Sequence, residues 1–301
     1  MKFVTFINQA GKTRAGWIKG EGIVDLNLAS EGKLPASMIE LLNQSESSLS
    51  IVEHLNHEVS PTYALDEVQL IAPLPRPNSF RDFVGFEQHL KNAKRFFNEP
   101  IPKEWYEVPV FYFSNPFTMK GPDQPVKRPA GCVRLDYELE LACIIGKEGS
   151  DIKAEEAFNH IFGFTILNDW TARDLQAQEL KVGLGMAKGK DFATSIGPYI
   201  VTKDELEPYR IGDKYDLEMT ARRNGKVMCQ GNYKDVYYSF AQMIERASAN
   251  VTLYPGDILA SGTVGFGTVL EVGPDIHGWL KPGDEVEFEI TGLGKLRNRV
   301  V

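Results

Sequence analysis

Acidic residues at every second position mark the segment 135–145, LDYELELACII. If this segment forms a strand, Asp136, Glu138 and Glu140 share one face and apolar side chains occupy the other. The run is entirely apolar from Ala142 to Ile145, which is typical of an interior strand and would carry the carboxylates inward. Buried like charges repel each other and lose hydration, and a divalent cation would offset both effects. A solvated face of a half-buried strand explains the same spacing.

A second polar group lies in the segment 162–180, FGFTILNDWTARDLQAQEL, which predicts an apolar strand leading directly into a helix at 169–180. Asp169 could serve simply as the N-cap of that helix. However, Asp169, Arg173 and Gln176 recur at spacings of four and three, which would place them on one helix face. That face is polar where a packed helix would be apolar. The three side chains together could hold a metal ion and a negatively charged oxygen.

Asp82 and His89 form a third candidate group, separated by seven positions, with the histidine in a helix predicted at 86–97. A single histidine is more often a surface or core residue than a catalyst. Its charged neighbours Glu87 and Lys91 do not by themselves complete a catalytic pair.

Several common catalytic motifs are absent from the sequence. The run 183–190, GLGMAKGK, is not a phosphate-binding loop, because Leu184 and Asp191 stand where that loop requires glycine and Ser or Thr. A G-x-S-x-G elbow does not occur, and no Cys or His pair has zinc spacing. Any metal ion is therefore expected to be held by oxygen atoms.

The composition narrows the class of protein. With 301 residues, 43% of them hydrophobic, the chain can form one catalytic domain with a small appendage. Its net charge of −8 argues against a nucleic-acid partner. The odd number of separated cysteines, Cys132, Cys143 and Cys229, indicates a reducing compartment without disulfides. The chain begins without an export signal and has no run of about eighteen apolar residues, so we expect a cytoplasmic protein without membrane contact.

Two regions follow from the pattern of elements. Residues 1–72 predict a small β-meander with strands at 2–7, 13–19 and 23–26, and two helices at 36–44 and 48–56. Pro73, Pro75 and Pro77 cannot share a helix or a central strand, so they mark a boundary. We therefore expect a small N-terminal α/β appendage, residues 1–72, and a catalytic domain, residues 73–301.

The second region is rich in strands, and Asn224-Gly225 predicts a tight hairpin. Because strands and helices do not alternate regularly, the pattern favours an α+β fold with a mixed or antiparallel sheet over a doubly wound sheet or a barrel. The expected strands are 136–145, 160–167, 196–202, 214–230, 257–262, 268–272, 284–290 and 295–301, and the helices are 86–97, 153–161, 169–180 and 237–248.

The motifs, taken in order, resemble the fumarylacetoacetate hydrolase family over residues 70–301. They are D-x6-H from Asp82, Y-E-L-E from Tyr137, N-D-x3-R-D-x-Q from Asn168, G-K-D-F from Gly189, S-G-T from Ser261, and L-E ending at Glu271. The resemblance implies a strand-rich fold of this family, a mixed β-sandwich or roll with a few helices, and a homodimer.

By this resemblance, four carboxylates are the ligands of Mg²⁺, or of Mn²⁺ or Ca²⁺: Asp82, Glu138, Glu140 and Asp169. An all-carboxylate set suits such hard cations. No organic cofactor is implied.

The resemblance also implies roles around the metal. His89 is expected to be the general base, with Glu271 as its partner, although the loop before Glu271 is shorter than in the animal enzymes. Lys190 is expected to bind the developing oxyanion with Arg173 and Gln176. Two further residues, Thr263 and Tyr112, are expected to contact the substrate. Val84 departs from the family pattern, because the animal enzymes carry a tyrosine there.

The expected activity is a magnesium-dependent hydrolysis of a carbon–carbon bond in a small 1,3-dioxo acid, such as an acylpyruvate, fumarylpyruvate or fumarylacetoacetate. The alternative is decarboxylation or isomerisation of a 2-oxo acid, oxaloacetate or a 2-hydroxy-dienoate, through the same enolate. Glu271 favours hydrolysis, as does Asn92, which stands where some members with these other reactions carry a glutamate. A non-catalytic protein that binds a metabolite in the same cleft is a rival of another class.

Overall fold

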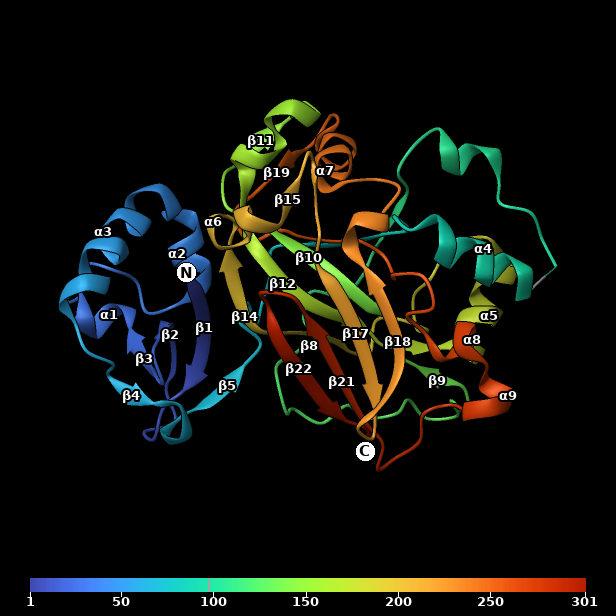
Figure 1. Ribbon diagram of the computed structural model, residues 1–301, viewed down its shortest axis with the longest axis horizontal. Helices are drawn as coiled ribbons and strands as arrows, with labels where there is room; N and C mark the ends of the chain where they lie inside the picture. Colours follow the sequence, from blue (N-terminus) through green and yellow to red (C-terminus); the bar gives the residue numbers. More distant parts are fainter. Residues whose placement is uncertain (97) are drawn as a thin grey trace.

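One large sheet runs through the whole molecule. The computed structural model describes residues 1–96 and 98–301. The main path of the sheet has the order β4-β3-β2-β1-β14-β12-β10-β20-β6-β7, while β5 pairs with β1 and β8 with β14 (Figure 1). Along that order the bounds are Tyr63–Ala64, Gly22–Asp25, Thr13–Lys19, Lys2–Ile7, Thr194–Thr202, Ile161–Asp169, Leu139–Ile145, Ile258–Ala260, Phe80–Phe83 and Phe111–Phe113, with β5 at Gln69–Ile71 and β8 at Met119–Lys120.

A second sheet lies in front of the central strands in the view of Figure 1. Its order is β18-β17-β21-β22, with bounds Lys226–Asn232, Glu218–Arg223, Glu285–Ile290 and Gly294–Arg299. Leu141 and Cys143 of β10 belong to the same buried cluster as Phe288 of β21. Ala142 and Ile144 belong to the cluster that contains the N-terminal helices. Strand β10 is therefore covered on both faces, which explains why its sequence is continuously apolar.

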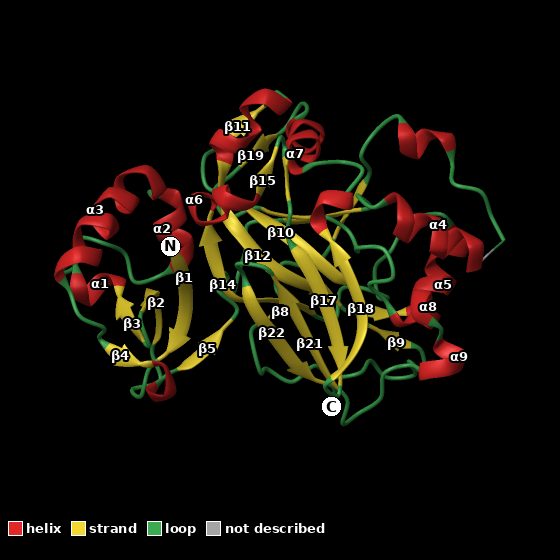
Figure 2. Ribbon diagram, viewed as in Figure 1, coloured by secondary structure: helices red, strands yellow, loops and turns green. Residues whose placement is uncertain are grey.

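Shorter elements complete the fold, and helices gather at the left, top and right of the sheets in Figure 2. The remaining strand pairs are β9 Leu135–Asp136 with β13 Thr171–Ala172, β11 Gly149–Ser150 with β19 Thr252–Leu253, and β15 Arg210–Ile211 with β16 Lys214–Tyr215. The α-helices α1 to α9 are Leu26–Ala29, Met38–Asn43, Ser45–Glu58, Glu87–Phe96, Arg173–Val182, Lys203–Leu206, Phe240–Ser248, Val269–Val272 and Pro274–His277. Turns of 3-10 helix span Leu65–Glu67, Lys103–Tyr106, Ala154–His160, Glu207–Tyr209 and Tyr233–Asp235.

The strand-rich α+β architecture is confirmed, and so is the hairpin at residues 224–225. Asn224 and Gly225 both adopt positive φ, 51° and 78°, between β17 and β18. Two neighbouring residues with positive φ are the signature of the tight hairpin turn that was predicted.

Three local predictions are wrong or shifted. The strand expected at 268–272 is the helix α8, whose start is capped because the Thr268 hydroxyl accepts a hydrogen bond from the Glu271 amide. The helix expected at 153–161 is a 3-10 helix. The helix expected at 169–180 begins at Arg173, because Asp169 still belongs to β12. The helix expected at 86–97 is α4, and the last position of that prediction, Phe97, lies outside the described residues.

The N-terminal region continues the main sheet. Strand β1 pairs with β14, with Phe3 opposite Ile200. Its helices share a buried cluster with the central strands, in which Leu41 and Trp17 lie with Ile144 and Ile200. The division at residue 73 therefore stays a prediction about folding units, while the two regions share one sheet and part of one core.

Candidate active site

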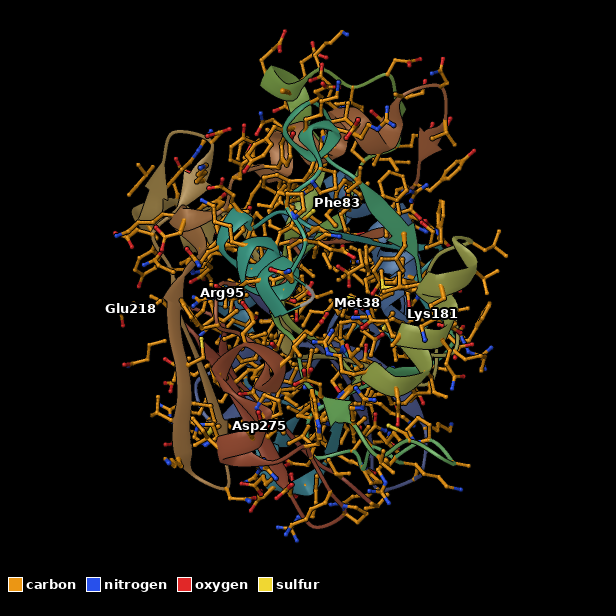
Figure 3. All side chains as sticks on the ribbon, turned by 90° about the vertical axis from the view of Figure 1, so that its right-hand side faces the viewer. Met38, Phe83, Arg95, Lys181, Glu218 and Asp275 are labelled. Atoms are coloured by element: carbon orange, nitrogen blue, oxygen red, sulfur yellow. The ribbon has the colours of Figure 1, made fainter. Side chains whose placement is uncertain are left out.

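A cavity of about 700 Å³ lies between α4 and α5. Figure 3 looks at this side of the molecule, with Arg95 marking α4 and Lys181 marking α5 on opposite sides of the view. Helix α4 contributes His89 and Leu90 to the wall, and α5 contributes Arg173 and Gln176. Other residues that line the cavity are Asp82, Val84, Tyr112, Glu138, Glu140, Lys190, Thr263 and Leu270.

Three buried carboxylates lie close together, and two of them, Asp82 and Glu140, line this cavity. Asp82 lies in strand β6, Glu140 lies in β10 and Asp169 ends β12. These strands belong to one sheet, in the order β12-β10-β20-β6, which brings the three side chains together. Each offers an oxygen, and these oxygens lie within 4.8 Å of one another. Burial and mutual repulsion raise the pKa of Asp82 and Glu140 well above the usual carboxylate range, and burial also raises the pKa of Asp169.

This carboxylate set fits a hard divalent cation. Asp169 Oδ1 is buried and has no hydrogen-bond partner among the described residues, although buried carboxylate oxygens are normally paired. A cation between the three side chains would satisfy that atom and offset their repulsion. Oxygen ligands of this kind are typical of Mg²⁺, Mn²⁺ and Ca²⁺.

The S-G-T turn fixes Glu140. The Gly262 amide donates to Glu140 Oε2 at 3.1 Å, and the Thr263 hydroxyl donates to Oε1 at 3.2 Å. Gly262 has φ +78°, and a Cβ there would lie 2.3 Å from the Phe83 carbonyl oxygen. Glycine is therefore required at this position for the turn to approach β6. Thr263, expected at the substrate, both lines the cavity and supports a carboxylate.

Two cations balance Glu138. Lys190 Nζ lies 2.6 Å from Glu138 Oε2, and Arg173 Nη2 lies 2.7 Å from Oε1. Burial raises the pKa of Glu138, but Lys190 and Arg173 outweigh it and bring that pKa to about 2. Glu138 is therefore ionised but engaged at both oxygens. Its predicted role as a fourth metal ligand requires one of these ion pairs to rearrange, and it stays a prediction.

Lys190 reaches further into the acidic cluster. Its Nζ also donates to Asp169 Oδ2 at 2.5 Å and to Thr171 Oγ1 at 2.8 Å. Burial lowers the pKa of Lys190, but Asp169 and Glu138 outweigh it, so the pKa is raised and the lysine keeps its proton. Tyr112, expected at the substrate, lines the cavity and donates a short hydrogen bond to Asp169.

His89 and Glu271 are in contact. His89 Nδ1 lies 2.9 Å from Glu271 Oε2, and the Glu271 side chain is completely buried. The Glu271 side chain therefore does not face solvent. Burial lowers the pKa of His89, but the charge and hydrogen bond of Glu271 outweigh it, so the pKa is raised. Because Nδ1 is engaged, Nε2 is the ring nitrogen that can exchange a proton with a bound molecule.

The sequence placed Asp169 wrongly and did not reveal the contacts of Asn92 and Asp136. Asp169 is neither a helix N-cap nor part of the α5 face, because Ala172 occupies the cap position. Arg173 and Gln176 do share that face, and Arg173 Nη1 donates to Gln176 Oε1 at 3.2 Å. Asn92 Nδ2 donates to Glu271 Oε1 at 2.9 Å, and Asp136 accepts from Arg173 Nε at 2.9 Å. Both contacts join segments far apart in the chain, so no local pattern reveals them.

Comparison with known proteins decides the family. Residues 78–301 match a family model described as fumarylacetoacetate (FAA) hydrolase C-terminal. The chain belongs to the fumarylacetoacetate hydrolase family. Within it, the mitochondrial oxaloacetate tautomerase FAHD2A of Bos taurus is 36% identical over 286 residues, which cover 94% of this chain and 85% of that protein. The Homo sapiens oxaloacetate tautomerase FAHD2A is 35% identical with the same coverage.

Solved structures of the family have the same fold. Fumarylacetoacetate hydrolase from Exiguobacterium antarcticum has a TM-score of 0.75 at 28% identity, covering 100% of this chain and 99% of that chain. Maleylpyruvate hydrolase from Sphingobium sp. SYK-6, solved with manganese(II) and pyruvate, has a TM-score of 0.76 at 26% identity and the same coverage. These relatives are named as enzymes, but as tautomerases and hydrolases, so the family alone does not fix the reaction.

The comparisons also bear on location. The oxaloacetate tautomerases of Bos taurus and Homo sapiens are named as mitochondrial. Among the described residues, no helix is both long and apolar enough to cross a membrane. The expectation of a cytoplasmic protein stays a prediction.

Proposed function

We propose that this member of the fumarylacetoacetate hydrolase family is a magnesium-dependent tautomerase that interconverts the keto and enol forms of a small 2-oxo acid of the oxaloacetate type. This is the isomerase alternative, and the relatives named oxaloacetate tautomerases, similar along 94% of the chain, support it over hydrolysis. The geometry that best supports it is that His89 lines the same cavity as Arg173 and Lys190. The pKa values of both cations are raised, so both stay charged.

The metal's part follows from the carboxylates. Asp82, Glu140 and Asp169 would hold the ion, with Glu138 as the fourth predicted ligand. When bound, the ion supplies positive charge to the oxygens of the 2-oxo acid and so stabilises the enolate.

The proton transfer is assigned to His89. Its Nε2 takes a proton from the carbon next to the 2-oxo group, and Glu271 stabilises the resulting imidazolium. Negative charge then develops on the 2-oxo oxygen, where Lys190, Arg173 and Gln176 provide positive charge and hydrogen-bond donors. Because Lys190 and Arg173 hold their protons, the proton on His89 is the one returned to the enolate oxygen.

Hydrolysis of a carbon–carbon bond is the second candidate, and one observation favours it. The 2.9 Å contact between His89 and Glu271 is the pairing expected of a base that activates water. In that reaction His89 takes a proton from water, the hydroxide adds to the distal carbonyl, and collapse of the adduct expels the enolate. Two structural neighbours are named as hydrolases.

One assay set separates the candidates. Loss of enol absorbance from freshly dissolved enol-oxaloacetate reports tautomerisation, and pyruvate release from acylpyruvates or oxaloacetate reports hydrolysis or decarboxylation. We expect Mg²⁺-dependent loss of the enol without pyruvate release. Efficient pyruvate release from an acylpyruvate, with no acceleration of tautomerisation, would overturn the proposal in favour of hydrolysis.

Variants tie that activity to the site. His89→Asn should abolish tautomerisation, while His54→Asn, at an exposed histidine of α3, should leave it unchanged. Equal activity in the two variants would remove His89 from the mechanism. Sedimentation in the same buffer tests the homodimer that the family resemblance implies.

A further inference from the structure

Asp136 is a buried carboxylate that does not line the cavity. Its side chain is completely inaccessible, and it lies at the end of β9, two residues before Glu138. The spacing of the sequence placed it on one face with Glu138 and Glu140. The strand is interrupted between Asp136 and Leu139, however, and the Asp136 carboxylate makes contacts of its own.

Each oxygen of Asp136 accepts hydrogen bonds from separate parts of the chain. Oδ2 accepts from Arg173 Nε at 2.9 Å and from the Leu270 amide at 3.2 Å. Oδ1 accepts from the Val269 amide at 2.7 Å and from the Tyr137 amide at 2.9 Å. One carboxylate therefore binds both the guanidinium of α5 and the first amides of α8.

The two contacts connect Asp136 to two sides of the cavity with different proposed roles. Arg173 continues to Glu138 and to Gln176, the polar side where negative charge is expected to develop. Helix α8 carries Glu271, whose Oε2 accepts from the Thr268 hydroxyl at 3.0 Å and pairs with His89. The first turn of a four-residue helix has little stability of its own, so its position depends on such contacts.

We propose that Asp136 is a positioning residue that fixes Arg173 and the Glu271-bearing helix α8 relative to each other, so that the oxyanion-binding side and the base of the cavity keep one geometry. A carboxylate is needed because all four partners are donors. An amide at this position would turn an NH₂ group either toward Arg173 and the Leu270 amide or toward the Val269 and Tyr137 amides, and those contacts would open.

The N-terminal region holds a matched control. Asp25 is also completely buried, pairs with Arg14 Nε at 2.7 Å, and accepts from the Asn27 and Leu28 amides at the start of α1. It therefore has the same chemistry, an arginine and the first amides of a short helix. None of its contacts with the described residues involves a residue that lines the cavity.

The test compares Asp136→Asn with Asp25→Asn in the full chain, each checked for folding by circular dichroism and thermal unfolding. The readout is the pKa of His89 by NMR, assigned with His89→Asn among the five histidines. The charged groups that act on His89 are Glu271, Glu138 and Arg173. We expect the His89 pKa to fall in Asp136→Asn toward its value in Glu271→Gln, and kcat to fall about a hundredfold with little change in KM.

Asp25→Asn should lose thermal stability but keep both the His89 pKa and kcat. An Asp136→Asn protein that is folded, less stable and unchanged in its His89 pKa would reduce Asp136 to a structural residue and overturn the inference.

A second variant covers the case in which Asp136→Asn does not fold. Val269→Pro removes one amide donor at the first position of α8, where proline is tolerated, and leaves the Asp136–Arg173 pair in place. It should lower the His89 pKa while the Asp136–Arg173 contact persists, and an unchanged His89 pKa would count against the inference. The role in turnover rests on the proposed function. The His89 titration does not, so a wild type inactive as a tautomerase with an intact Asp136 effect would refute the function and keep the positioning role.

Discussion

The N-terminal region and the carboxylate cluster of the candidate active site both contain buried aspartates, but the groups around those aspartates differ. Around Asp25 every described contact is a donor: Arg14 binds both oxygens, at 2.7 and 2.8 Å, and two backbone amides add to it. In the active-site cluster, Asp82, Glu140 and Asp169 lie close to one another, and one oxygen of Asp169 has no hydrogen-bond partner among the described residues. Burial alone therefore does not distinguish a structural acid from a functional one, whereas uncompensated negative charge does.

The largest effect is expected from Glu140→Gln, which removes the charge of one carboxylate in the active-site cluster. Under the proposed function, a bound metal would contribute several kcal/mol to stabilising the enolate, so we expect activity to fall about a thousandfold and divalent-ion binding to be lost in calorimetry. Without metal, the variant should be no less stable than wild type, because repulsion with Asp82 is relieved. Undiminished Mg²⁺ binding would contradict the assignment of this cluster.

The converse change is Asp25→Asn. It removes the charged partner of the half-buried Arg14, so we expect the free energy of unfolding in urea to fall by about 2 kcal/mol. The specific activity of the folded protein should stay at the wild-type level. A large loss of activity per folded molecule would mean that the N-terminal region takes part in the site.

Metal binding should separate the same two variants. At a Mg²⁺ concentration about a hundredfold above Kd, binding to the native state alone stabilises a protein by about 2.7 kcal/mol. We expect this rise in thermal scans of wild type and Asp25→Asn, and none for Glu140→Gln. Calcium and manganese serve as comparison ions, and potassium serves as the control for ionic strength.

The smallest effect concerns the His89–Glu271 pair. The folded pKa of His89 is raised above its ordinary value of 6.5, so the pair stabilises the fold fully below that value. This contribution is lost as the pH rises through the folded pKa. We therefore expect wild type to exceed Glu271→Gln in stability by about 1 kcal/mol more on the acid side than at alkaline pH.

The activity should depend on pH in the opposite direction from the stability. The base must be neutral, so the rate falls as the pH drops through the raised pKa of His89. In Glu271→Gln this acid limb should move to lower pH. If Glu271→Gln changes the pH dependence of stability but leaves the acid limb of the rate profile in place, the group that limits the rate is not the His89 that pairs with Glu271.

The burial of the acidic residues could be predicted, because period-two spacing in 136–140 and the end of an apolar strand at Asp169 are local signals. The interruption of the strand between Asp136 and Leu139 could not. Helix α8 could not, since four residues are too few to establish a helical period and the run TVLEV reads as a strand. What makes it a helix is the Thr268 cap together with Asp136, which contacts it across more than 130 residues. The hydrogen bond from Asn92 to Glu271 could not be predicted either, because it also joins segments far apart in the chain.

The pairing of β1 with β14 has a consequence for how the protein is made. Phe3 lies opposite Ile200, so the first strand leaves the ribosome long before β14 exists, although its other partners β2 and β5 emerge early. Until β14 emerges, an apolar strand edge is available to other chains, and such long-range pairing is slow. Nascent chains that end before residue 194 should therefore depend on chaperones far more than the full-length chain does.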